Sequence, residues 1–233
     1  MSGGDTRRDE MPEIRQHTTI PIRVAQRLPM YHRQLYELLL DGVTHISSAK
    51  LSAYMGVTAS QLRQDLSHFG RFGHHSYGYR VDELFHILTT ILGLTRKHKL
   101  VLVGAGPLGQ ALAAHEGFVK RGFCIEAIFD IDPILVGRTL AGAEIMPAEE
   151  LPGFLQRSKI DIGIIAVPAD AAQEVAETLV SNGVRALWNF APRRLEVPPT
   201  VVLEHVHLSD SLMSLAYRLH KLGVCKQQTA YRC

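Results

Sequence analysis

The segment that most constrains this chain is 99–109, which is KLVLVGAGPLG. An apolar run with β-branched residues, followed by G-x-G-x-x-G, is typical of the first strand and helix of a dinucleotide-binding βαβ unit. In such a unit Gly104 would make the tight turn, Gly106 would let the backbone approach a pyrophosphate, and Gly109 would let the helix pack on the strand. The free N–H groups and the positive dipole end of this helix would then face the phosphates.

The second predicted strand, CIEAIFDID, ends in an acidic residue within reach of a ribose. Asp130 would accept hydrogen bonds from a free 2′-hydroxyl and repel a 2′-phosphate, which favours NAD(H) over NADP(H). D-I-D-P is also good turn chemistry, so a solvated turn residue is the alternative role for Asp130. Asp132 is a second candidate for the ribose contact.

Later strand ends would complete the cleft, because ligands of open α/β sheets sit outside the carboxyl ends of the strands. The segments at 166–168 and 189–191 close two such strands, although each residue taken singly is as readily an ordinary loop or core residue. The cofactor-binding set predicted from this half of the chain is Gly104, Ala105, Gly106, Pro107, Leu108, Gly109, Asp130, Ile131, Asp132, Val167, Pro168, Asn189 and Phe190.

From Leu100 onward, predicted strands and helices alternate, which specifies a parallel sheet wrapped by helices. We expect helices over PLGQALAAHEGFVKRG, EIMPAEELPGFLQRSK, ADAAQEVAETLVSNG and SDSLMSLAYRLHKLG. We expect further strands over DIGIIAVP, RALWNFAP and VVLEHVHL.

The residues before this unit have a helical pattern instead. LPMYHRQLYELLLDG carries apolar residues at helical spacing. Ser47 or Ser48 would cap a short helix ending at Gly56, and Thr58 would cap a second one, which makes a helix-turn-helix signature. The segment GRFGHHSYGYRV is typical of a β-hairpin, the wing of a winged helix. The expected fold class is α/β, with an N-terminal winged-helix domain and a C-terminal Rossmann-type parallel-sheet domain.

The composition is that of an ordinary folded protein, with 46% hydrophobic and 21% charged residues. No apolar run approaches the length of a membrane span and the N-terminus lacks a signal-peptide core, so we expect a cytoplasmic protein with no membrane partner. Cys124, Cys225 and Cys233 are odd in number without C-x-x-C spacing, which argues against a disulfide framework or a zinc site. The net charge of +2 does not by itself establish a nucleic-acid partner.

An oxidoreductase would need a substrate pocket and an acid or base near the hydride. Everything after Gly104 is used in completing one Rossmann-type domain and a last helix, so no length remains for a substrate domain. His115, His205 and His207 are the nearest candidates for proton transfer, but such residues are more often structural or solvated. The sequence has no nucleophile elbow, no H-E-x-x-H and no P-loop lysine. We therefore predict a DNA-binding protein that is not an enzyme, with no catalytic residue and no metal site.

Taken together, these segments resemble the Rex family of bacterial redox-sensing transcriptional repressors. The resemblance covers nearly all of Pro21 to Gly223 and rests on RLPMYHRQL, SSAKL, QLRQDLSHFGRFG, YGY, VGAGPLGQAL, FDIDPILVG, AVPADAAQ and NFAPRRLEVP in that order. It implies a homodimeric winged-helix repressor with NADH and NAD+ as cofactors. Such a repressor occupies a palindromic operator in double-stranded DNA when NADH is scarce and leaves when NADH binds.

The resemblance also implies the domain organisation. The family's last helix crosses into the partner subunit, which would make it a domain-swapped dimerisation arm. The implied divisions are a mobile lead-in at 1–20, a winged-helix DNA-binding domain at 21–97, a Rossmann-type NAD(H)-binding domain at 98–208, the dimerisation helix at 209–223 and a tail at 224–233.

Arg63, on the second helix of the helix-turn-helix, is the first choice for a direct base contact, bidentate to a guanine. A phosphate contact or a solvated charge is the alternative for this side chain. The full predicted DNA-binding set is Ser47, Ser48, Lys50, Ser60, Gln61, Arg63, Gln64, Ser67, His68, Arg71, Phe72, Gly73, His74 and His75.

The chain departs from the family pattern at positions that bear on DNA contact and on coupling. Gln64 stands where the family is usually basic, and His74 and His75 stand at wing positions that are usually basic. His115 replaces, by alignment, a tyrosine near the nicotinamide, which adds it to the predicted cofactor set. The predicted interdomain coupling residues are Arg33, which matches a family arginine, and His207, which replaces an acidic residue.

Two other interpretations stay open from the sequence. One is a small NAD-dependent oxidoreductase whose N-terminal helices serve only for dimerisation. The other is a CoA-binding module, since that family of Rossmann domains shares this fold and glycine turn. Turnover of NADH with simple carbonyl substrates would favour the enzyme, whereas salt-dependent DNA binding relieved by NADH would favour the repressor.

Overall fold

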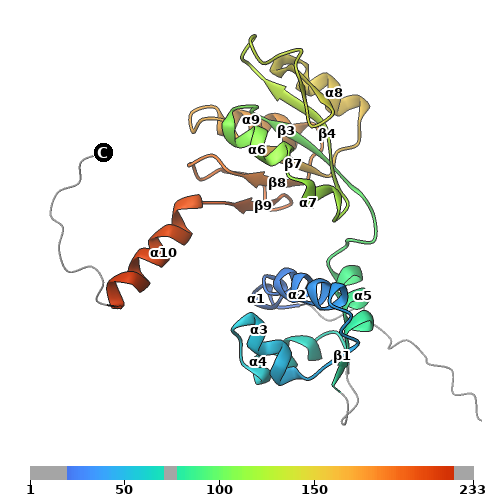
Figure 1. The fold of residues 1–233 in the computed structure, drawn as a ribbon. Coiled ribbons are helices and arrows are strands. Elements are labelled where there is room, and N and C mark those ends of the chain that lie inside the picture. Colours follow the sequence, from blue (N-terminus) through green and yellow to red (C-terminus); the bar gives the residue numbers. More distant parts are fainter. Residues whose placement is uncertain (1–19, 71–77, 223–233) are drawn as a thin grey trace, which may run out of the picture. The chain divides into compact units, whose positions relative to one another are not determined.

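A computed structural model describes residues 20–70 and 78–222 of the chain. Contacts divide the chain into two compact units, one ending at Arg96 and the other beginning at Lys97, and each is described by itself (Figure 1). Within the described residues, no helix combines the length and the apolar character needed to cross a membrane.

The first unit is helical, with one small sheet. Buried apolar side chains from α1 to α5 meet in a single core, with Leu35, Leu51, Leu62 and Leu88 at 0% exposure. The elements of this unit are α1 (Ile22–Ala25), α2 (Leu28–Leu40), β1 (His45–Ile46), α3 (Ser48–Met55), α4 (Ala59–Ser67), β2 (Tyr79–Arg80) and α5 (Val81–Ile91).

Helices α3 and α4 form the predicted helix-turn-helix, and their ends have the predicted caps. The Ser47 hydroxyl accepts a hydrogen bond from the Lys50 N–H at 3.2 Å, and the Thr58 hydroxyl accepts one from the Gln61 N–H at 3.1 Å. Helix α3 ends at Gly56, whose φ of +64° lies in the left-handed region that favours glycine. The start of each helix and the end of α3 are therefore set by residues that are close to them in the sequence.

The described end of the predicted wing, at 78–81, pairs with a strand that precedes α3, and the expected hairpin itself stays a prediction. Strand β2 pairs antiparallel with β1, so that Ile46 lies opposite Tyr79. Gly78 permits this approach, because a Cβ at its position would collide with the carbonyl oxygen of Ile46. Strand β1 could not be predicted from the sequence, because a strand of two residues is too short to show an alternating pattern. Residues 71–77 lie outside the described residues.

The second unit contains a seven-stranded sheet in the order β5-β6-β4-β3-β7-β8-β9. Every neighbouring pair is parallel except β5 with β6. The chain builds outward from central β3 on one side and then crosses to β7 on the other, which is the doubly wound order of a Rossmann-type domain. The strands are β3 (His98–Val103), β4 (Phe123–Asp130), β5 (Thr139–Leu140), β6 (Ala143–Pro147), β7 (Ile162–Ile165), β8 (Ala186–Asn189) and β9 (Val202–His205).

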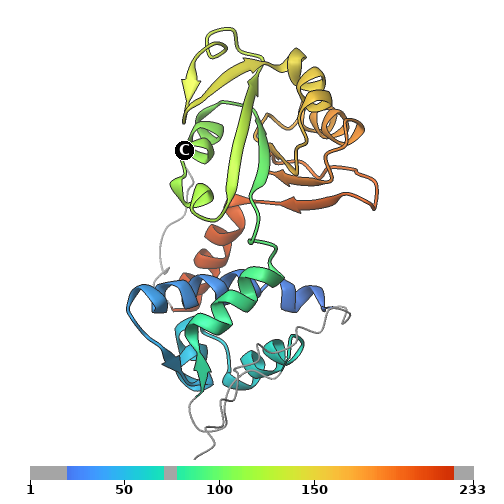
Figure 2. The same cartoon turned by 90° about the vertical axis from the view of Figure 1, so that its right-hand side faces the viewer.

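Helices cover both faces of this sheet (Figure 2). Because side chains alternate along β3, Val101 and Val103 pack toward α8 and α9, whereas Leu100 and Leu102 pack toward α6 and α7. Such two-sided burial explains why β3 is apolar at nearly every position. The helices of this unit are α6 (Pro107–Ala113), α7 (Glu116–Val119), α8 (Leu151–Arg157) with the short 3₁₀ helix η1 (Ala148–Glu150) before it, α9 (Ala172–Ser181) and α10 (Leu208–Lys221).

Two of the expected helices were wrong in their extent. Residues Ala143–Pro147 form strand β6 rather than the start of a helix, since Ile145 pairs with Ile128 of β4. The helix after the glycine turn is broken into α6 and α7, because His115 takes an extended conformation and caps α7 with its ring nitrogen. Strand β6 depends on pairing with β4, which is distant in sequence, whereas the break between α6 and α7 depends on the local cap at His115.

Candidate nucleotide-binding and DNA-binding sites

The glycine turn joins the carboxyl end of β3 to α6. Because the chain proceeds from β3 to β4 on one side and later to β7 on the other, this is the point where the strand order reverses. Gly104 has a φ of +101°, and a Cβ there would lie 2.5 Å from the Ala166 carbonyl oxygen at the end of β7. A Cβ on Gly109 would collide with the carbonyl oxygen of Gly104. Two of the three glycines are therefore required by the protein's own packing.

Gly106 differs from both, because no atom lies within 4 Å of the position that its Cβ would take. The fold itself does not need a glycine there, whereas a phosphate group approaching the backbone would. Pro107 has no N–H group, so the backbone donors at the start of α6 are those of Gly106, Leu108 and Gly109, and this donor set fits a pyrophosphate in charge and in space. The site thus fits the predicted dinucleotide.

Asp130 lies at the end of β4 and is bound to the glycine turn. Its Oδ2 accepts the Ala105 N–H at 2.5 Å, and its Oδ1 accepts the Asp132 N–H at 2.8 Å. The Asp132 carboxylate turns instead to its own loop, where it accepts the Ile134 N–H at 2.8 Å. Asp130 therefore combines the turn role with a place beside the glycine turn, while Ile131 between the two carboxylates is 82% exposed.

The later strand ends are only partly available to a ligand. Val167 is half-buried and Pro168 is exposed next to the glycine turn, with a Val167 methyl 3.1 Å from the Cβ position of Gly104. Asn189, in contrast, is 0% exposed, so its side chain offers no surface to a nucleotide, contrary to the prediction. Phe190 is half-buried and packs edge-on against Trp188, with ring centroids 4.5 Å apart.

Asn189 organises the loop that follows β8. Its amide NH₂ group donates to the carbonyl oxygens of Ala191 and Arg193, and its Oδ1 accepts the Ala191 N–H at 3.0 Å. The same NH₂ group lies 3.0 Å from Nδ1 of His205, which must accept this hydrogen bond. Burial of His205, the nearby His207 and the charge of Arg194 lower the pKa of His205. The neutral ring is the form that can accept from Asn189.

Three residues have a predicted role only through the family resemblance, and they lie on or beside three different elements. His115 follows the end of α6 farthest from Gly106, accepts the Gly117 N–H at 3.1 Å and stacks on Phe118. His207 is exposed just before α10, in the second unit, and Arg33 is exposed on α2, in the first. The structure does not bring His115 to the glycine turn, and the coupling roles of Arg33 and His207 stay predictions.

The surface of the helix-turn-helix presents polar side chains on one face of α4. Leu62, Asp65 and Leu66 are buried, while Arg63 is exposed and its guanidinium donates to the Ser48 hydroxyl at 3.1 Å. This contact holds Arg63 over the start of α3 without removing it from the surface. The exposed members of the predicted DNA-binding set are Ser47, Lys50, Ser60, Arg63, Gln64 and Ser67.

The remaining members of this set have other surroundings. Ser48 and His68 are half-buried, and the Gln61 amide points inward to donate to Asp65 at 2.8 Å. Gln61 therefore offers less to a DNA partner than its position in the sequence suggested. The wing members of the set lie outside the described residues, and their contacts stay predictions: Arg71, Phe72, Gly73, His74 and His75.

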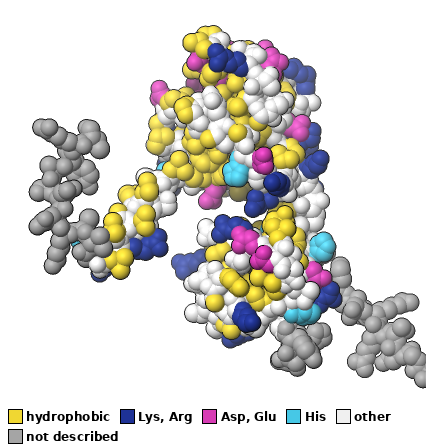
Figure 3. Space-filling model, viewed as in Figure 1, with side chains coloured by type: hydrophobic (Ala, Val, Ile, Leu, Met, Phe, Trp, Pro, Cys, Tyr) yellow, Lys and Arg dark blue, Asp and Glu magenta, His cyan; other side chains and the backbone are white. Residues whose placement is uncertain are grey.

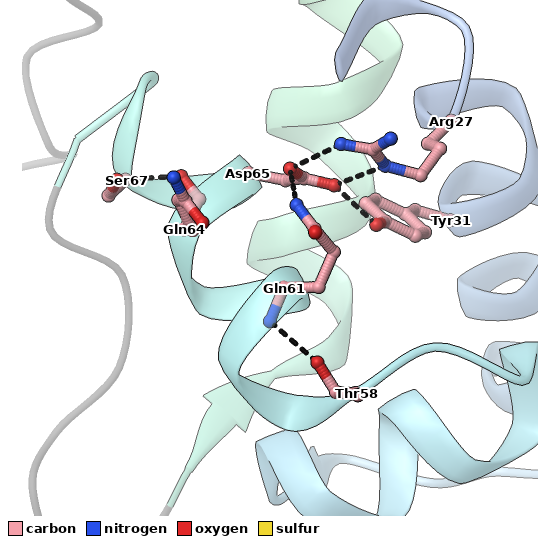
Figure 4. Close-up of polar contacts among 7 residues, drawn as sticks. All are labelled: Arg27, Tyr31, Thr58, Gln61, Gln64, Asp65 and Ser67. Atoms are coloured by element: carbon pink, nitrogen blue, oxygen red, sulfur yellow. Dashed lines mark hydrogen bonds and ion pairs between the residues drawn. The ribbon is translucent and has the colours of Figure 1, made fainter. Parts of the chain in front are cut away.

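Sequence reasoning missed a buried ionic cluster under α4. Asp65 is 0% exposed, and the Arg27 guanidinium binds both of its carboxylate oxygens, at 2.6 and 2.7 Å (Figure 4). Burial alone would raise the pKa of Asp65, but hydrogen bonds from Arg27, Tyr31 and Gln61 outweigh burial and lower it. Burial, followed by the hydrogen bond to this carboxylate, raises the pKa of Tyr31 to about 12.

Comparisons with known proteins match both units. A family model described as "Putative DNA-binding protein N-terminus" matches residues 19–67, and one described as "CoA binding domain" matches residues 95–193. The redox-sensing transcriptional repressor Rex of Thermoanaerobacter sp. (strain X514) is 51% identical over 210 residues, which cover 90% of this chain and 94% of the relative. The chain belongs to the Rex family. Its relatives are named as transcriptional repressors and not as enzymes.

Solved structures of a Rex-family repressor, RSP, agree with the whole architecture. RSP in complex with β-NADH superposes with a TM-score of 0.83 at 48% identity, covering 89% of this chain and 98% of RSP. RSP in complex with β-NAD+ and operator DNA gives 0.83 at 50% identity, covering 89% and 96%. These Rex structures confirm the fold class, an N-terminal DNA-binding unit followed by a Rossmann-type sheet. The CoA-binding match covers less than half of the chain, and the shared Rossmann-type fold accounts for it.

Proposed function

We propose that this Rex-family chain is a redox-sensing transcriptional repressor that binds operator DNA through its first unit and leaves it when NADH binds its second unit. The observation that carries the proposal is the 51% identity to a Rex repressor over 90% of the chain. The two sites add support, since one chain holds both an exposed polar helix face and an open glycine turn.

The exposed face of α4 and the start of α3 would contact DNA. A helix-turn-helix places its second helix in the major groove, with side chains near the start of that helix on the base edges. Arg63 is the side chain there that can bind a guanine through two hydrogen bonds. Lys50 and the capped start of α3 would then meet phosphate groups, which position the protein without reading sequence.

NADH and NAD+ would bind across the glycine turn of the second unit. The N–H groups after Gly106 would hold the pyrophosphate, and Asp130, fixed beside the turn, would accept hydrogen bonds from the ribose hydroxyls. When bound, the nicotinamide supplies the redox signal, because its oxidised ring is charged and its reduced ring is neutral. The ligand can release DNA only if it binds the non-competent arrangement of the protein more tightly.

We further propose that the repressor is a homodimer formed through α10. None of the residues of this helix is buried, and apolar side chains gather along it (Figure 3). Their spacing alternates between four and three residues, which makes one continuous stripe of the kind that packs against another helix. The residues of this stripe, called the α10 stripe below, are Leu208, Leu212, Leu215, Leu219 and Leu222.

A two-fold dimer matches a palindromic operator, because two copies of α4 would meet two identical half-sites about one turn of DNA apart. The exposed stripe therefore belongs to the same function as the helix-turn-helix. We place this function in the cytoplasm, where the NAD(H) pool and bacterial DNA are found together.

The proposed DNA function is tested by selecting duplexes from a random-sequence pool with the full chain. We expect enrichment of palindromic sites, with binding that weakens as salt rises because phosphate contacts release counterions. Recovery of unrelated sequences with no shared half-site would contradict the proposal. NADH turnover with simple carbonyl compounds in the same preparation would favour the oxidoreductase instead.

A further inference from the structure

The buried carboxylate of Asp65 lies on the inner side of α4, beneath the face that is proposed to meet DNA. Its Oδ2 accepts from Arg27 Nε at 2.6 Å and from the Tyr31 hydroxyl at 2.6 Å. Its Oδ1 accepts from Arg27 Nη2 at 2.7 Å and from Gln61 Nε2 at 2.8 Å. Figure 4 shows these side chains converging from α4, from α2 and from the residue before α2.

A buried charge of this kind is costly unless it is fully hydrogen-bonded, and an apolar residue at the same place is often as stabilising. The neighbours Leu62 and Leu66 already supply α4 with apolar anchors, at 0% and 2% exposure. Apolar contacts are not directional, so they define the rotation of a helix less sharply than a hydrogen bond does. A carboxylate bound by two parallel N–H groups of a guanidinium has one orientation.

Rotation of α4 about its axis decides which side chains face outward. At 3.6 residues per turn, Arg63 and Ser67, each two residues from Asp65, lie about 200° away around the helix. Asp65 therefore faces inward on the side of α4 opposite to Arg63 and Ser67, which are exposed. Its partners belong to α2 and the residue before it, at separations of 38 and 34 residues, so the cluster ties α4 to a different part of the unit.

We propose that Asp65 is a positioning residue for DNA recognition, whose bonds to Arg27 and Tyr31 fix the rotation of α4 so that Arg63, Gln64 and Ser67 meet base edges in a single register. This inference rests on the proposed function. Asp65 itself does not touch DNA. A misrotated α4 would keep its phosphate attraction, since that attraction depends on charge rather than on orientation. It would lose base readout, which depends on the geometry of each hydrogen bond.

The variants Asp65→Asn and Tyr31→Phe test this inference. Asp65→Asn keeps the size of the side chain but removes its charge, and Tyr31→Phe keeps the ring but removes one hydrogen bond. Thr89→Val is the matched control, because it removes the 3.0 Å hydrogen bond to His32 between α5 and α2 without changing any residue of the cluster. All proteins are measured well below their unfolding temperatures, with circular dichroism as the check on folding.

The readout is the ratio of affinities for a palindromic duplex selected by the parent protein and for a duplex of scrambled sequence. We expect Asp65→Asn to lower this ratio about tenfold or more, and Tyr31→Phe to lower it less, mostly through the selected duplex. Thr89→Val should keep the parent ratio even where its loss of thermal stability is as large as that of Tyr31→Phe. The NADH affinity of all variants should stay at the parent value, since the glycine turn is untouched.

A folded Tyr31→Phe protein that keeps the parent ratio, or a Thr89→Val protein that loses as much as Tyr31→Phe, would overturn the positioning role. Tyr31→Phe decides the matter if Asp65→Asn does not fold. A parent protein with no preference for any duplex would overturn the proposed function and this inference together. If the parent prefers its selected duplex and every cluster variant has the same affinity ratio as the parent, this inference alone would be overturned.

Discussion

Single residues at the two sites carry the chemistry of recognition, and the clearest case is Arg63. Its guanidinium is exposed on α4 and is held by the Ser48 hydroxyl at 3.1 Å, so it is oriented before DNA arrives. An arginine held in this way loses less side-chain entropy when it binds a guanine. Lysine at the same place would keep the charge but lose the paired N–H groups.

Arg63→Ala should cost about 1–3 kcal/mol on the selected operator and relax the base preference at one position in each half-site. Arg63→Lys is the matched control, since it keeps the attraction to phosphate. Binding measured on a set of single-base operator variants checks this expectation. Equal losses on every sequence would show that Arg63 touches only the backbone of DNA.

Asp130→Ala should weaken NADH binding while leaving DNA affinity intact in the absence of nucleotide. The carboxylate lies beside the glycine turn and accepts the Ala105 N–H, so its removal takes away both the ribose partner and a support of the turn. Calorimetric titration with NADH measures the effect, with Asp132→Ala as the control because that carboxylate faces its own loop. If only Asp132→Ala weakens binding, the ribose contact belongs to Asp132.

At the scale of elements, local signals predicted the fold well, and distant pairings escaped prediction. The caps at Ser47 and Thr58 and the stop at Gly56 lie within a few residues of the helices they define, and the structure has all three. The carboxylate of Asp65 could not be assigned, since its guanidinium partner is 38 residues away and no periodicity connects them. Asn189 was misassigned for a different reason, because its amide turns into the loop that follows β8 and toward His205, which leaves the residue buried.

The stability of the first unit should depend on Asp65 as the pH falls. The pKa of this carboxyl is lower in the folded chain than in the unfolded chain, where it is about 3.9. The stabilisation it contributes is therefore present above the unfolded value and is lost as the pH falls through the folded one. In denaturant titrations from pH 7 to pH 2, the difference in unfolding free energy between the parent and Asp65→Asn should shrink toward acid. A difference that is constant with pH would mean that the charge of Asp65 does not stabilise this unit.

As the proposed dimer, the whole molecule would hold two copies of α4, two nucleotide sites and two α10 stripes. Leu212→Asp/Leu219→Asp places charges within the α10 stripe, where burial against a partner would be costly. We expect a monomer in sedimentation experiments and a large loss of operator affinity, because single half-sites bind weakly. The double variant Ser214→Asp/His220→Asp adds as many carboxylates, each about 120° around the helix from the stripe, and should remain dimeric. A dimer that survives the stripe substitutions would assign the interface to another surface.

The central claim is that NADH and operator DNA bind this chain antagonistically. The most direct measurement is the anisotropy of a labelled, selected operator titrated with the full chain at fixed salt, with NADH, with NAD+ and without nucleotide. We predict an operator Kd at least about tenfold higher with NADH than with NAD+ or without nucleotide. By linkage, saturating operator should raise the NADH Kd by the same factor that separates the operator Kd with NADH from the operator Kd without nucleotide. The same operator Kd under all three conditions would contradict it.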